Sequence, residues 1–456
     1  MAPNIAVKSI EYSERRVPFQ HPFRFGAVTV NEASQLFVHL TAQVDGKNST
    51  GVTAELMVPK WFNKDPALSA DETVDQLRRS AAIAREIYLN ARPDTAFGLH
   101  AACHAAQVAE CAKAGIPPLA AAFGAAEIDK AVLDALLRAA KSDFFSGMRG
   151  NIAGIDARLT PDLSGDAIAS FLVHRTPSPR IAVRYTVGML DTIDSVRQAA
   201  RDYRYFKLKL CGDPAKDKVR LVEIVQALGA IDYRATADAN EQYQSTEDLR
   251  TLVEALRNDR ALAPLGKRLL YIEQPFAREN TWNFDLTPLA GNAAFIIDEA
   301  DDSYDAFLRA RTLGYRGVST KSCKGLYKSL LNGARAAQWS EATGEFFVSA
   351  EDLTCQPGLA LQQDTALIAF HGLAHAERNG HHYVDGFADT PVQEAGAFLA
   401  AHPDLYERSN GTVRLSVREG AIATGSLAVP GFACALEPTR IGSTPNQRNK
   451  FKELAS

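Results

Sequence analysis

The stretch YFKLKLCG, residues 205–212, places two lysines within an apolar run of strand-forming residues. In a β-strand, alternate side chains leave the same face, so Lys207 and Lys209 should lie side by side. Like charges repel, and buried lysines are rare unless opposite charge pairs with them. The pair therefore requires an explanation, which the surrounding segments provide.

Seven further apolar segments of strand length follow or precede this one, most of them separated by helical segments such as DKVRLVEIVQALGA (217–230). They are RIAVRYTVGM (180–189), RATADANEQ (234–242), LLYIEQPF (269–276), AFIIDEAD (294–301), RGVSTKSC (316–323), EFFVSAEDL (345–353) and LAHAERNG (373–380). Eight βα-type units within residues 175–385 favour a closed (β/α) barrel over an open doubly wound sheet. No G-x-G-x-x-G or P-loop sequence opens any of these helices, so nothing supports a nucleotide-binding fold.

The flanking regions have a different rhythm. Residues 4–60 alternate strand-like runs with turns, and LFVHLTAQV followed by DGKNSTG predicts a hairpin. Residues 70–145 are helical in pattern, with Ser69 or Asp71 as the N-cap of the first helix. Hairpin character returns beyond residue 385. We therefore predict an α+β capping domain over 1–145, the barrel over 175–385, and a segment over 386–456 that returns to the cap.

Composition narrows the class of protein. The chain has 456 residues, of which 46% are hydrophobic and 23% charged, with a net charge of −4. This balance argues against nucleic acid or an anionic membrane as a partner, and neither a signal peptide nor an apolar run of membrane length is evident. Six cysteines without a C-x-x-C pair suit a reducing compartment. We expect a cytoplasmic homo-oligomer that acts on a small molecule.

Polar residues stand near the C-terminal end of successive predicted strands, at intervals that each fit one βα repeat. In chain order they are Lys207, Lys209, Asp238, Asn240, Glu273, Asp298, Glu299 and Lys321. The C-terminal mouth of such a barrel is where active sites lie. Three carboxylates from successive strands make a hard, all-oxygen site suited to Mg²⁺, with Mn²⁺ as an alternative.

The lysines add acid–base chemistry to this predicted metal site. One lysine strand precedes the three carboxylate strands and another follows them, so Lys209 and Lys321 should face each other across the barrel. A lysine acts as a base only if its pKa is lowered, which a neighbouring ammonium and a divalent cation achieve. On this hypothesis Lys207 helps to keep Lys209 deprotonated, and the cation stabilises the enediolate formed when a carboxylate substrate loses its α-proton.

The series K-x-K, D-x-N, E-Q-P, D-E and K resembles the enolase superfamily, nearest the muconate-lactonizing (Lys/Lys) branch of its mandelate racemase group. The resemblance implies a modified (β/α)₇β barrel with an α+β cap. It implies Asp238, Glu273 and Asp298 as metal ligands and Lys209 and Lys321 as acid–base residues. It also implies that two N-terminal loops, near PFQHPFRFG (18–26) and ELMVPKWF (55–62), close over the substrate.

Several assignments stay open at this stage. Lys324 competes with Lys321, and only the family pattern selects Asp298 over Glu299. Asn240, Glu351 and His21 are candidate substrate contacts, although a structural salt bridge would equally explain Glu351. The histidines at 371, 375, 381 and 382 are interpreted as surface or packing residues rather than a metal site. Where dipeptide epimerases carry D-x-D, this chain has AHAERNGHH.

The leading hypothesis is Mg²⁺-dependent abstraction of the α-proton of a carboxylate, leading to racemisation or epimerisation, or to cycloisomerisation. Racemisation and epimerisation need both lysines, whereas cycloisomerisation needs only one as the working acid–base group. Syn β-elimination, as in an acid dehydratase, also needs one. The alternative from another class is a non-catalytic protein that binds a small molecule under the cap.

Overall fold

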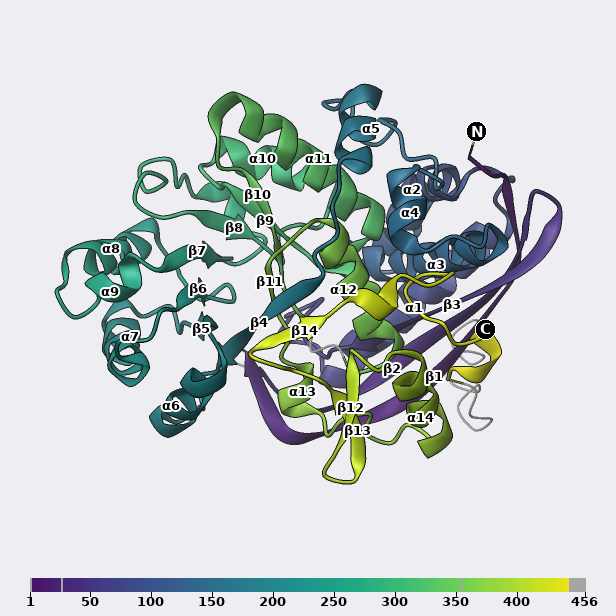
Figure 1. Ribbon diagram of the computed structural model, residues 1–456. Coiled ribbons are helices and arrows are strands. Elements are labelled where there is room, and N and C mark those ends of the chain that lie inside the picture. The colour runs from purple at the N-terminus through teal and green to yellow at the C-terminus, as the bar shows by residue number, and fades with distance from the viewer. Residues whose placement is uncertain (1, 26–27, 354–355, 443–456) are drawn as a thin grey trace.

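A three-stranded antiparallel sheet opens the chain in the computed structural model, which describes residues 2–25, 28–353 and 356–442 (Figure 1). The sheet has the order β1 (Ile5–Phe25), β2 (Val28–Val44) and β3 (Lys47–Met57). The predicted turn DGKNSTG is shorter than expected, because only Asp45 and Gly46 lie between paired strands. Both have positive φ, as a two-residue type I′ hairpin requires.

Helices pack on this sheet to complete the cap. They are α1 (Ala70–Leu89), α2 (Ala96–Lys113) and α3 (Pro118–Ala139). Ser69 is the N-cap of α1, where it forms a reciprocal capping box with Glu72. Helix α3 contacts β2 and β3 and approaches β3 closely, since a Cβ on Gly51 would lie 2.0 Å from the carbonyl oxygen of Ala131.

Eight parallel strands form a closed barrel, which confirms all eight predicted strands. They are β4 (Arg180–Val187), β5 (Tyr205–Lys209), β6 (Arg234–Asp238), β7 (Leu269–Glu273), β8 (Phe295–Ile297), β9 (Gly317–Thr320), β10 (Phe347–Ala350) and β11 (His375–Glu377). Each pairs with the next, and β11 pairs with β4 to close the ring. The fold class expected from the sequence is therefore confirmed.

Helices connect these strands on the outside of the barrel (Figure 1). They are α6 (Ile193–Asp202), α7 (Pro214–Leu228), α8 (Thr246–Asn258), α9 (Ala263–Gly266), α10 (Ala306–Thr312), α11 (Leu326–Thr343) and α12 (Leu359–Phe370). The connection from β7 to β8 has a 3-10 helix, Thr281–Asn283, in place of an α-helix. Helices α4 (Phe144–Arg149) and α5 (Gly165–Val173) lie between cap and barrel in the sequence.

The C-terminal segment contacts both parts. Helix α13 (Gly380–Tyr383) directly precedes this segment, which contains α14 (Val392–Ala401), the hairpin β12 (Tyr406–Ser409) and β13 (Thr412–Leu415), and β14 (Ala421–Ala423). Strand β14 pairs antiparallel with β4 of the barrel. Toward the cap, Arg15 forms an ion pair with Glu394 at 2.7 Å, and the Phe432 amide donates to Asp134 at 2.7 Å. The predicted domain boundaries stay a prediction, and residues 443–456 of the predicted returning segment lie outside the described residues.

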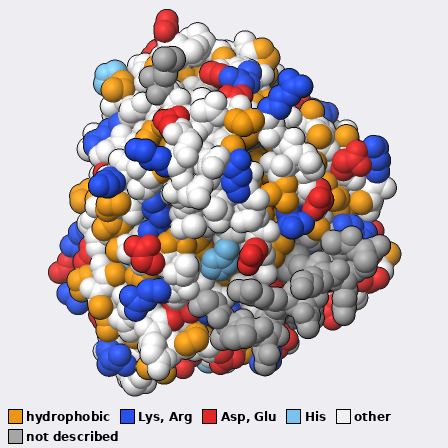
Figure 2. Space-filling view, turned by 90° about the vertical axis from the view of Figure 1, so that its right-hand side faces the viewer, with side chains coloured by type: hydrophobic (Ala, Val, Ile, Leu, Met, Phe, Trp, Pro, Cys, Tyr) orange, Lys and Arg blue, Asp and Glu red, His pale blue; other side chains and the backbone are white. Residues whose placement is uncertain are grey.

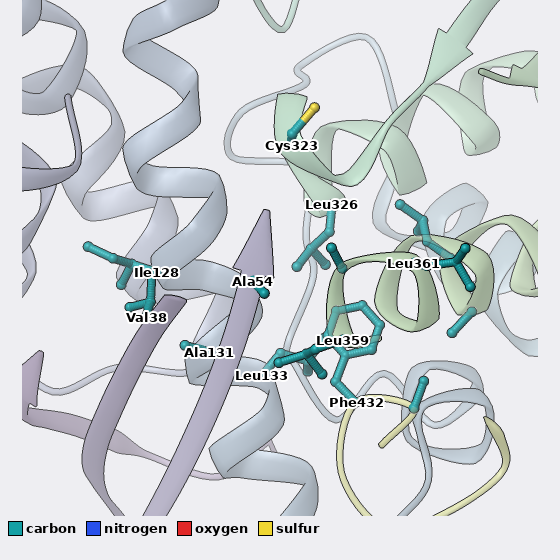
Figure 3. Packing of buried hydrophobic residues seen from close by; sticks show 14 of the residues in the cluster. Val38, Ala54, Ile128, Ala131, Leu133, Cys323, Leu326, Leu359, Leu361 and Phe432 are labelled. Carbon is teal, nitrogen blue, oxygen red and sulfur yellow. The ribbon is translucent and has the colours of Figure 1, made fainter. Parts of the chain in front are cut away.

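One apolar core crosses the junction of the cap and the barrel, and a second apolar cluster lies within the barrel and its outer helices. Figure 3 shows the junction, where the sheet, α3, the start of α11, α12 and the C-terminal segment meet through residues that include Val38, Ala54, Ile128, Leu133, Leu326, Leu359 and Phe432. Burial of such side chains contributes roughly 1.5–3 kcal/mol each. The cap is thereby fixed to the barrel at its C-terminal mouth.

On the face shown in Figure 2, acidic and basic side chains are interspersed rather than gathered by sign. Within the described ranges, no helix is both long and apolar enough to cross a membrane. The five described cysteines are unbridged, and Cys355 lies outside the described residues.

Candidate active site

A pocket lies between the barrel mouth and the cap, with about 330 Å³ of empty space that is partly open to solvent. The cap contributes Phe23, Val58 and Trp61 to its lining. The barrel contributes Lys207, Lys209, Asp238, Asn240, Asp298, Lys321, Asp352, Leu353, Glu377 and Asn379. The structure therefore brings together most of the side chains singled out from the sequence.

Strand register sets the spacing of the central residues. In the parallel ladder, Lys209 pairs with Asp238, and Asp238 pairs with Glu273. Neighbouring strands lie about 4.8 Å apart, so the three side chains form one row. Asp298 follows directly after the next strand, β8, and Lys321 directly after β9. The two lysines thus stand at opposite ends of a row of three buried carboxylates.

Lys207 lies at the centre of the negative charge. Its ammonium contacts Asp238 at 2.9 Å, Glu273 at 2.8 Å, Glu351 at 2.8 Å and Glu377 at 2.9 Å. Burial alone would lower the pKa of Lys207, but these carboxylates raise it well above its ordinary value. Its charge is therefore offset by four carboxylates, and its expected influence on Lys209 stays a prediction.

Lys209 and Lys321 each pair with a carboxylate at one end of the row. Lys209 donates to Asp238 Oδ2 at 2.7 Å, and Lys321 donates to Asp298 Oδ2. The Lys321 ammonium also lies 4.6 Å from the ring centroid of Trp61. Burial lowers the pKa of Lys321, while Asp298 and Glu273 raise it, with a net rise. Both lysines line the pocket.

Lys324 and Glu299, the alternatives to Lys321 and Asp298, both lie outside the pocket lining. Lys324 is buried against the Asp298 carbonyl at 3.0 Å and Ser319 Oγ at 2.8 Å, and it is not among the residues that line the pocket. Glu299 turns away from the pocket and contacts Lys64 of the cap at 3.2 Å. These positions favour Lys321 and Asp298.

Gln274 fixes the position of Asp298. Its side-chain Oε1 accepts from the amides of Asp298 at 2.8 Å and Ala300 at 3.1 Å. Its Nε2 donates to the carbonyl of Phe276 at 2.8 Å. The backbone of Gln274 has φ +36°, a conformation that is uncommon for a residue other than glycine. The E-Q-P motif thus supplies a positioning residue directly after Glu273.

The donor set fits a divalent cation. Glu273 is fully buried, and its Oε1 has no hydrogen-bond partner among the described residues. Its Oε2 meets the Lys207 ammonium at 2.8 Å, without hydrogen-bond geometry. Burial raises the pKa of Glu273, and Asp238 and Glu351 raise it further. A buried, incompletely satisfied carboxylate among other carboxylates is what a hard cation would complement.

The carboxylates are paired with lysines in the described structure. Burial raises the pKa of Asp298, but Lys321 and Lys324 lower it more, so that its pKa lies well below the ordinary value. Within residues 2–25, 28–353 and 356–442, no group of three or more acidic, histidine or cysteine side chains is already arranged to hold a metal ion. Loading would therefore require the acids to exchange lysine contacts for metal contacts.

The other predicted substrate contacts have different surroundings. Asn240 lines the pocket, and its backbone amide donates to Asp238 Oδ1 at 2.8 Å. Glu351 lies outside the pocket lining, where its Oε1 accepts from Arg184 at 2.8 Å and from Tyr271 at 2.7 Å. Its Oε2 accepts from the Lys207 ammonium at 2.8 Å, which is the structural salt bridge considered as the alternative for Glu351. His21 is exposed and does not line the pocket.

The first predicted lid is not a loop. Residues up to Phe25 belong to strand β1, and Gly26 lies outside the described residues. Pairing with β2 is irregular between Pro18 and Phe23, so residues two apart here do not share a face. As a result Phe23 reaches the pocket while His21 points to solvent. The second predicted lid does supply Val58 and Trp61.

Sequence reasoning missed the residues at the end of β11. Glu377 and Asn379 line the pocket, with Glu377 Oε1 accepting from Thr186 at 2.8 Å and from Asn379 at 3.1 Å. The available signal was the same two-residue spacing that singled out Lys207 with Lys209. Asp352, after β10, was missed as well, and its carboxylate accepts from the backbone amide of Asn379 at 2.7 Å.

The four histidines that flank or begin β11 have packing roles. His375 stacks on Tyr205 with ring centroids 4.6 Å apart, and the rings of His381 and His382 lie 4.0 Å apart. Burial lowers the pKa of His375 to about 3 and of His381 to about 4. His371 meets Ser329 Oγ at 2.9 Å. These contacts agree with the packing interpretation.

Comparison with known proteins gives a fold. No protein-family model matches the chain, and no curated protein matches its sequence. Among solved structures, a mandelate racemase/muconate lactonizing protein from Herpetosiphon aurantiacus matches with a TM-score of 0.61 at 18% identity, over 95% of this chain and 99% of the other. A muconate lactonizing enzyme from Pseudomonas fluorescens, complexed with muconolactone, matches with a TM-score of 0.61 at 18% identity, over 95% and 98%.

A third match is a dipeptide epimerase from Enterococcus faecalis V583, complexed with Mg and a dipeptide, with a TM-score of 0.60 at 13% identity over 94% of this chain and 99% of the other. A structure described as a member of the enolase superfamily, from Roseovarius nubinhibens, was solved with magnesium and matches with a TM-score of 0.57 at 16% identity, over 96% and 97%. The chain therefore has the fold of these structures, an eight-stranded parallel barrel with an N-terminal antiparallel capping sheet.

Proposed function

We propose that the protein is a metal-dependent enzyme of the enolase superfamily that removes the α-proton of a small carboxylate substrate. The observation that carries this proposal is the row Lys209, Asp238, Glu273, Asp298 and Lys321, which lines or underlies one pocket with a lysine at each end. Structures with the same fold include a muconate lactonizing enzyme, a dipeptide epimerase and complexes with magnesium.

Asp238, Glu273 and Asp298 would hold Mg²⁺ or Mn²⁺. When bound, the ion supplies positive charge where the substrate carboxylate gains negative charge. If these acids held the ion, Lys209 and Lys321 would no longer be paired with Asp238 and Asp298 as they are in the described structure. A nearby cation favours the neutral form of a lysine base, so one lysine Nζ would accept the α-proton as a neutral amine while the other, as an ammonium, would deliver one.

The lysines set the stereochemical possibilities. In a racemisation or epimerisation, Lys209 Nζ removes the α-proton from one face and Lys321 Nζ returns a proton to the other, with the roles exchanged for the opposite enantiomer. In a cycloisomerisation or syn β-elimination, one lysine transfers the proton and the other stabilises charge. We favour the two-base reaction, because both lysines line the pocket and each pairs with a different acid of the row.

The experiment that tests this function is exchange of substrate α-protons with deuterium from solvent. A library of 2-substituted carboxylic acids is incubated with protein and Mg²⁺ in D₂O and followed by NMR. We expect exchange for one compound class, and we expect excess EDTA to abolish it. If exchange continued undiminished in excess EDTA, the reaction would not require a metal ion. Saturable binding of an acid without exchange would instead favour the non-catalytic alternative.

The cap should respond to substrate. We expect amide hydrogen exchange in residues 19–25 and 57–61 to slow when an acid substrate binds, because Phe23, Val58 and Trp61 line the pocket and exclude water from it. Mass-spectrometric exchange with and without substrate measures this. Strand β12, none of whose residues lines the pocket, serves as the internal control. A saturating substrate that leaves both cap segments unchanged would show that they are not the lid.

A further inference from the structure

A group of charged residues outside the pocket lining joins the second cap loop to the barrel. Arg278, in the loop after β7, donates from Nη1 to the carbonyl of Phe62 at 3.0 Å and from Nη2 to the carbonyl of Trp61 at 2.9 Å. These are consecutive carbonyls of the loop that carries Trp61 over Lys321. Arg278 therefore binds the backbone of the loop rather than one of its side chains.

Glu241, in the loop after β6, holds the guanidinium in place. It accepts from Arg278 Nε at 2.8 Å and from Nη2 at 2.9 Å, and also from the Arg278 amide at 2.8 Å. Two parallel charge-assisted bonds fix the plane of the guanidinium. Burial raises the pKa of Glu241, but Lys64 and Arg278 together lower it to about 2. Glu241 is therefore an anion throughout the physiological range.

Lys64 makes the reciprocal contact from the cap. Its ammonium pairs with Glu241 and, at 3.2 Å, with Glu299, and it donates to the carbonyl of Asn240 at 3.3 Å. Three barrel loops thus converge on the cap loop, and they follow the strands of Asp238, Glu273 and Asp298. Asn240 and Glu241 both have positive φ, at 44° and 73°. Such backbone costs of order 1 kcal/mol per residue, so it needs contacts of this kind to persist.

The two aromatic residues of the loop divide its contacts. Phe62 packs edge-to-face on Phe123 of α3, with ring centroids 5.2 Å apart, which ties it to the cap core. Trp61 faces the pocket and the Lys321 ammonium. The barrel contacts this pair through the two backbone carbonyls that Arg278 binds and through Lys321 next to the Trp61 ring. The Trp61 and Phe62 rings also meet edge-to-face, with centroids 4.8 Å apart. A shift of the backbone that Arg278 binds would therefore move the Trp61 ring relative to Lys321.

We propose that Arg278 is a positioning residue that fixes the Trp61 ring over Lys321 by binding the carbonyls of Trp61 and Phe62, with Glu241 orienting its guanidinium. The significance of this placement for catalysis rests on the proposed function, which names Lys321 as an acid–base residue. The attachment itself does not rest on it. Arg278 then governs how readily the second cap loop opens, and with it the access of substrate and water to Lys321.

The test is amide hydrogen exchange of residues 58–66 in the full-length protein without substrate. Arg278→Met removes both carbonyl contacts, so exchange in this segment should become about tenfold to a hundredfold faster. Glu241→Gln should give a smaller increase in the same segment. Unchanged exchange in Arg278→Met would overturn the proposal, whatever the outcome of the substrate screen.

Arg335→Met is the matched control. Arg335 makes a fork with Asp162, at 2.8 and 2.6 Å, and also donates to the backbone carbonyl of Tyr304. Its removal breaks the same kind of contact elsewhere and should leave residues 58–66 unchanged. Faster exchange of that segment in both variants would mean general destabilisation and would overturn the specific role of Arg278.

Arg278→Lys separates positioning from stability. A lysine keeps the ion pair with Glu241, so the melting temperature should stay near that of the wild type, but one ammonium cannot reproduce the planar fork to two carbonyls. Loop exchange should therefore stay raised in Arg278→Lys. Restoration of wild-type exchange by lysine would show that charge alone is needed and would contradict the carbonyl-binding role.

Discussion

Replacing either Lys209 or Lys321 by alanine is expected to lower turnover by about 10³-fold or more, which is the range for loss of a positioned acid–base group. The two variants should then differ in what they retain. If the reaction is a racemisation or epimerisation, Lys321→Ala should still exchange the α-proton of one enantiomer, through Lys209. Lys209→Ala should exchange only the other. NMR of each enantiomer in D₂O measures both.

A different outcome would identify the one-base chemistry. In a cycloisomerisation or elimination, one variant should lose all proton transfer, and the other should keep slow exchange with either substrate face. Lys328→Met is the control, because Lys328 is a buried lysine of the same barrel that pairs with Asp301 and does not line the pocket. Near-wild-type turnover in Lys321→Ala would transfer its role to Lys324, and in Lys209→Ala would exclude lysine as the base on that side.

Removal of one carboxylate of the row should nearly abolish metal binding. Glu273→Gln is the sharpest choice, because Glu273 Oε1 has no hydrogen-bond partner among the described residues and the substitution removes a ligand with little change in shape. We expect the Mn²⁺ dissociation constant to rise by at least about 100-fold, since even residues behind metal ligands can cost 10- to 100-fold. Titration followed by electron paramagnetic resonance of free Mn²⁺ measures it.

Glu299→Gln is the matched control for the metal experiment. Glu299 neighbours Asp298 in the chain and is equally buried, yet it contacts Lys64 of the cap. Its replacement should change the Mn²⁺ dissociation constant less than about threefold, within the usual context dependence of a nearby charge. A large loss in Glu299→Gln with none in Glu273→Gln would reverse the assignment of ligands.

The barrel could be predicted because its signals are local. Apolar strands with polar residues at their ends recur at βα spacing, and two-residue spacing places Lys207 with Lys209 and Asp238 with Asn240 on one face. The closure of the barrel and the shared pocket follow from that pattern. The same signal after β11 was present at Glu377 and Asn379.

What could not be predicted depends on contacts distant in the chain. The charge around Lys207 comes from four strands, so its offset by Glu351 and Glu377 is invisible in YFKLKLCG. Arg278 and Glu241 belong to loops without a motif. The two prolines of PFQHPFRF suggest a loop, but Pro18 and Phe23 both pair with β2, and the irregular pairing between them does not end strand β1.

For protein engineering of this chain, the connecting loops and the strands differ in how much change in length they tolerate. The spacing of Lys209, Asp238 and Glu273 is set by backbone hydrogen bonds between β5, β6 and β7, so an insertion in a connecting loop leaves it unchanged. A one-residue slip within any of these strands would instead turn its functional side chain away from its neighbours. New specificity is therefore best sought by grafting loops onto an untouched ladder, and the same separation would allow loop lengths to drift during evolution while the reaction persists.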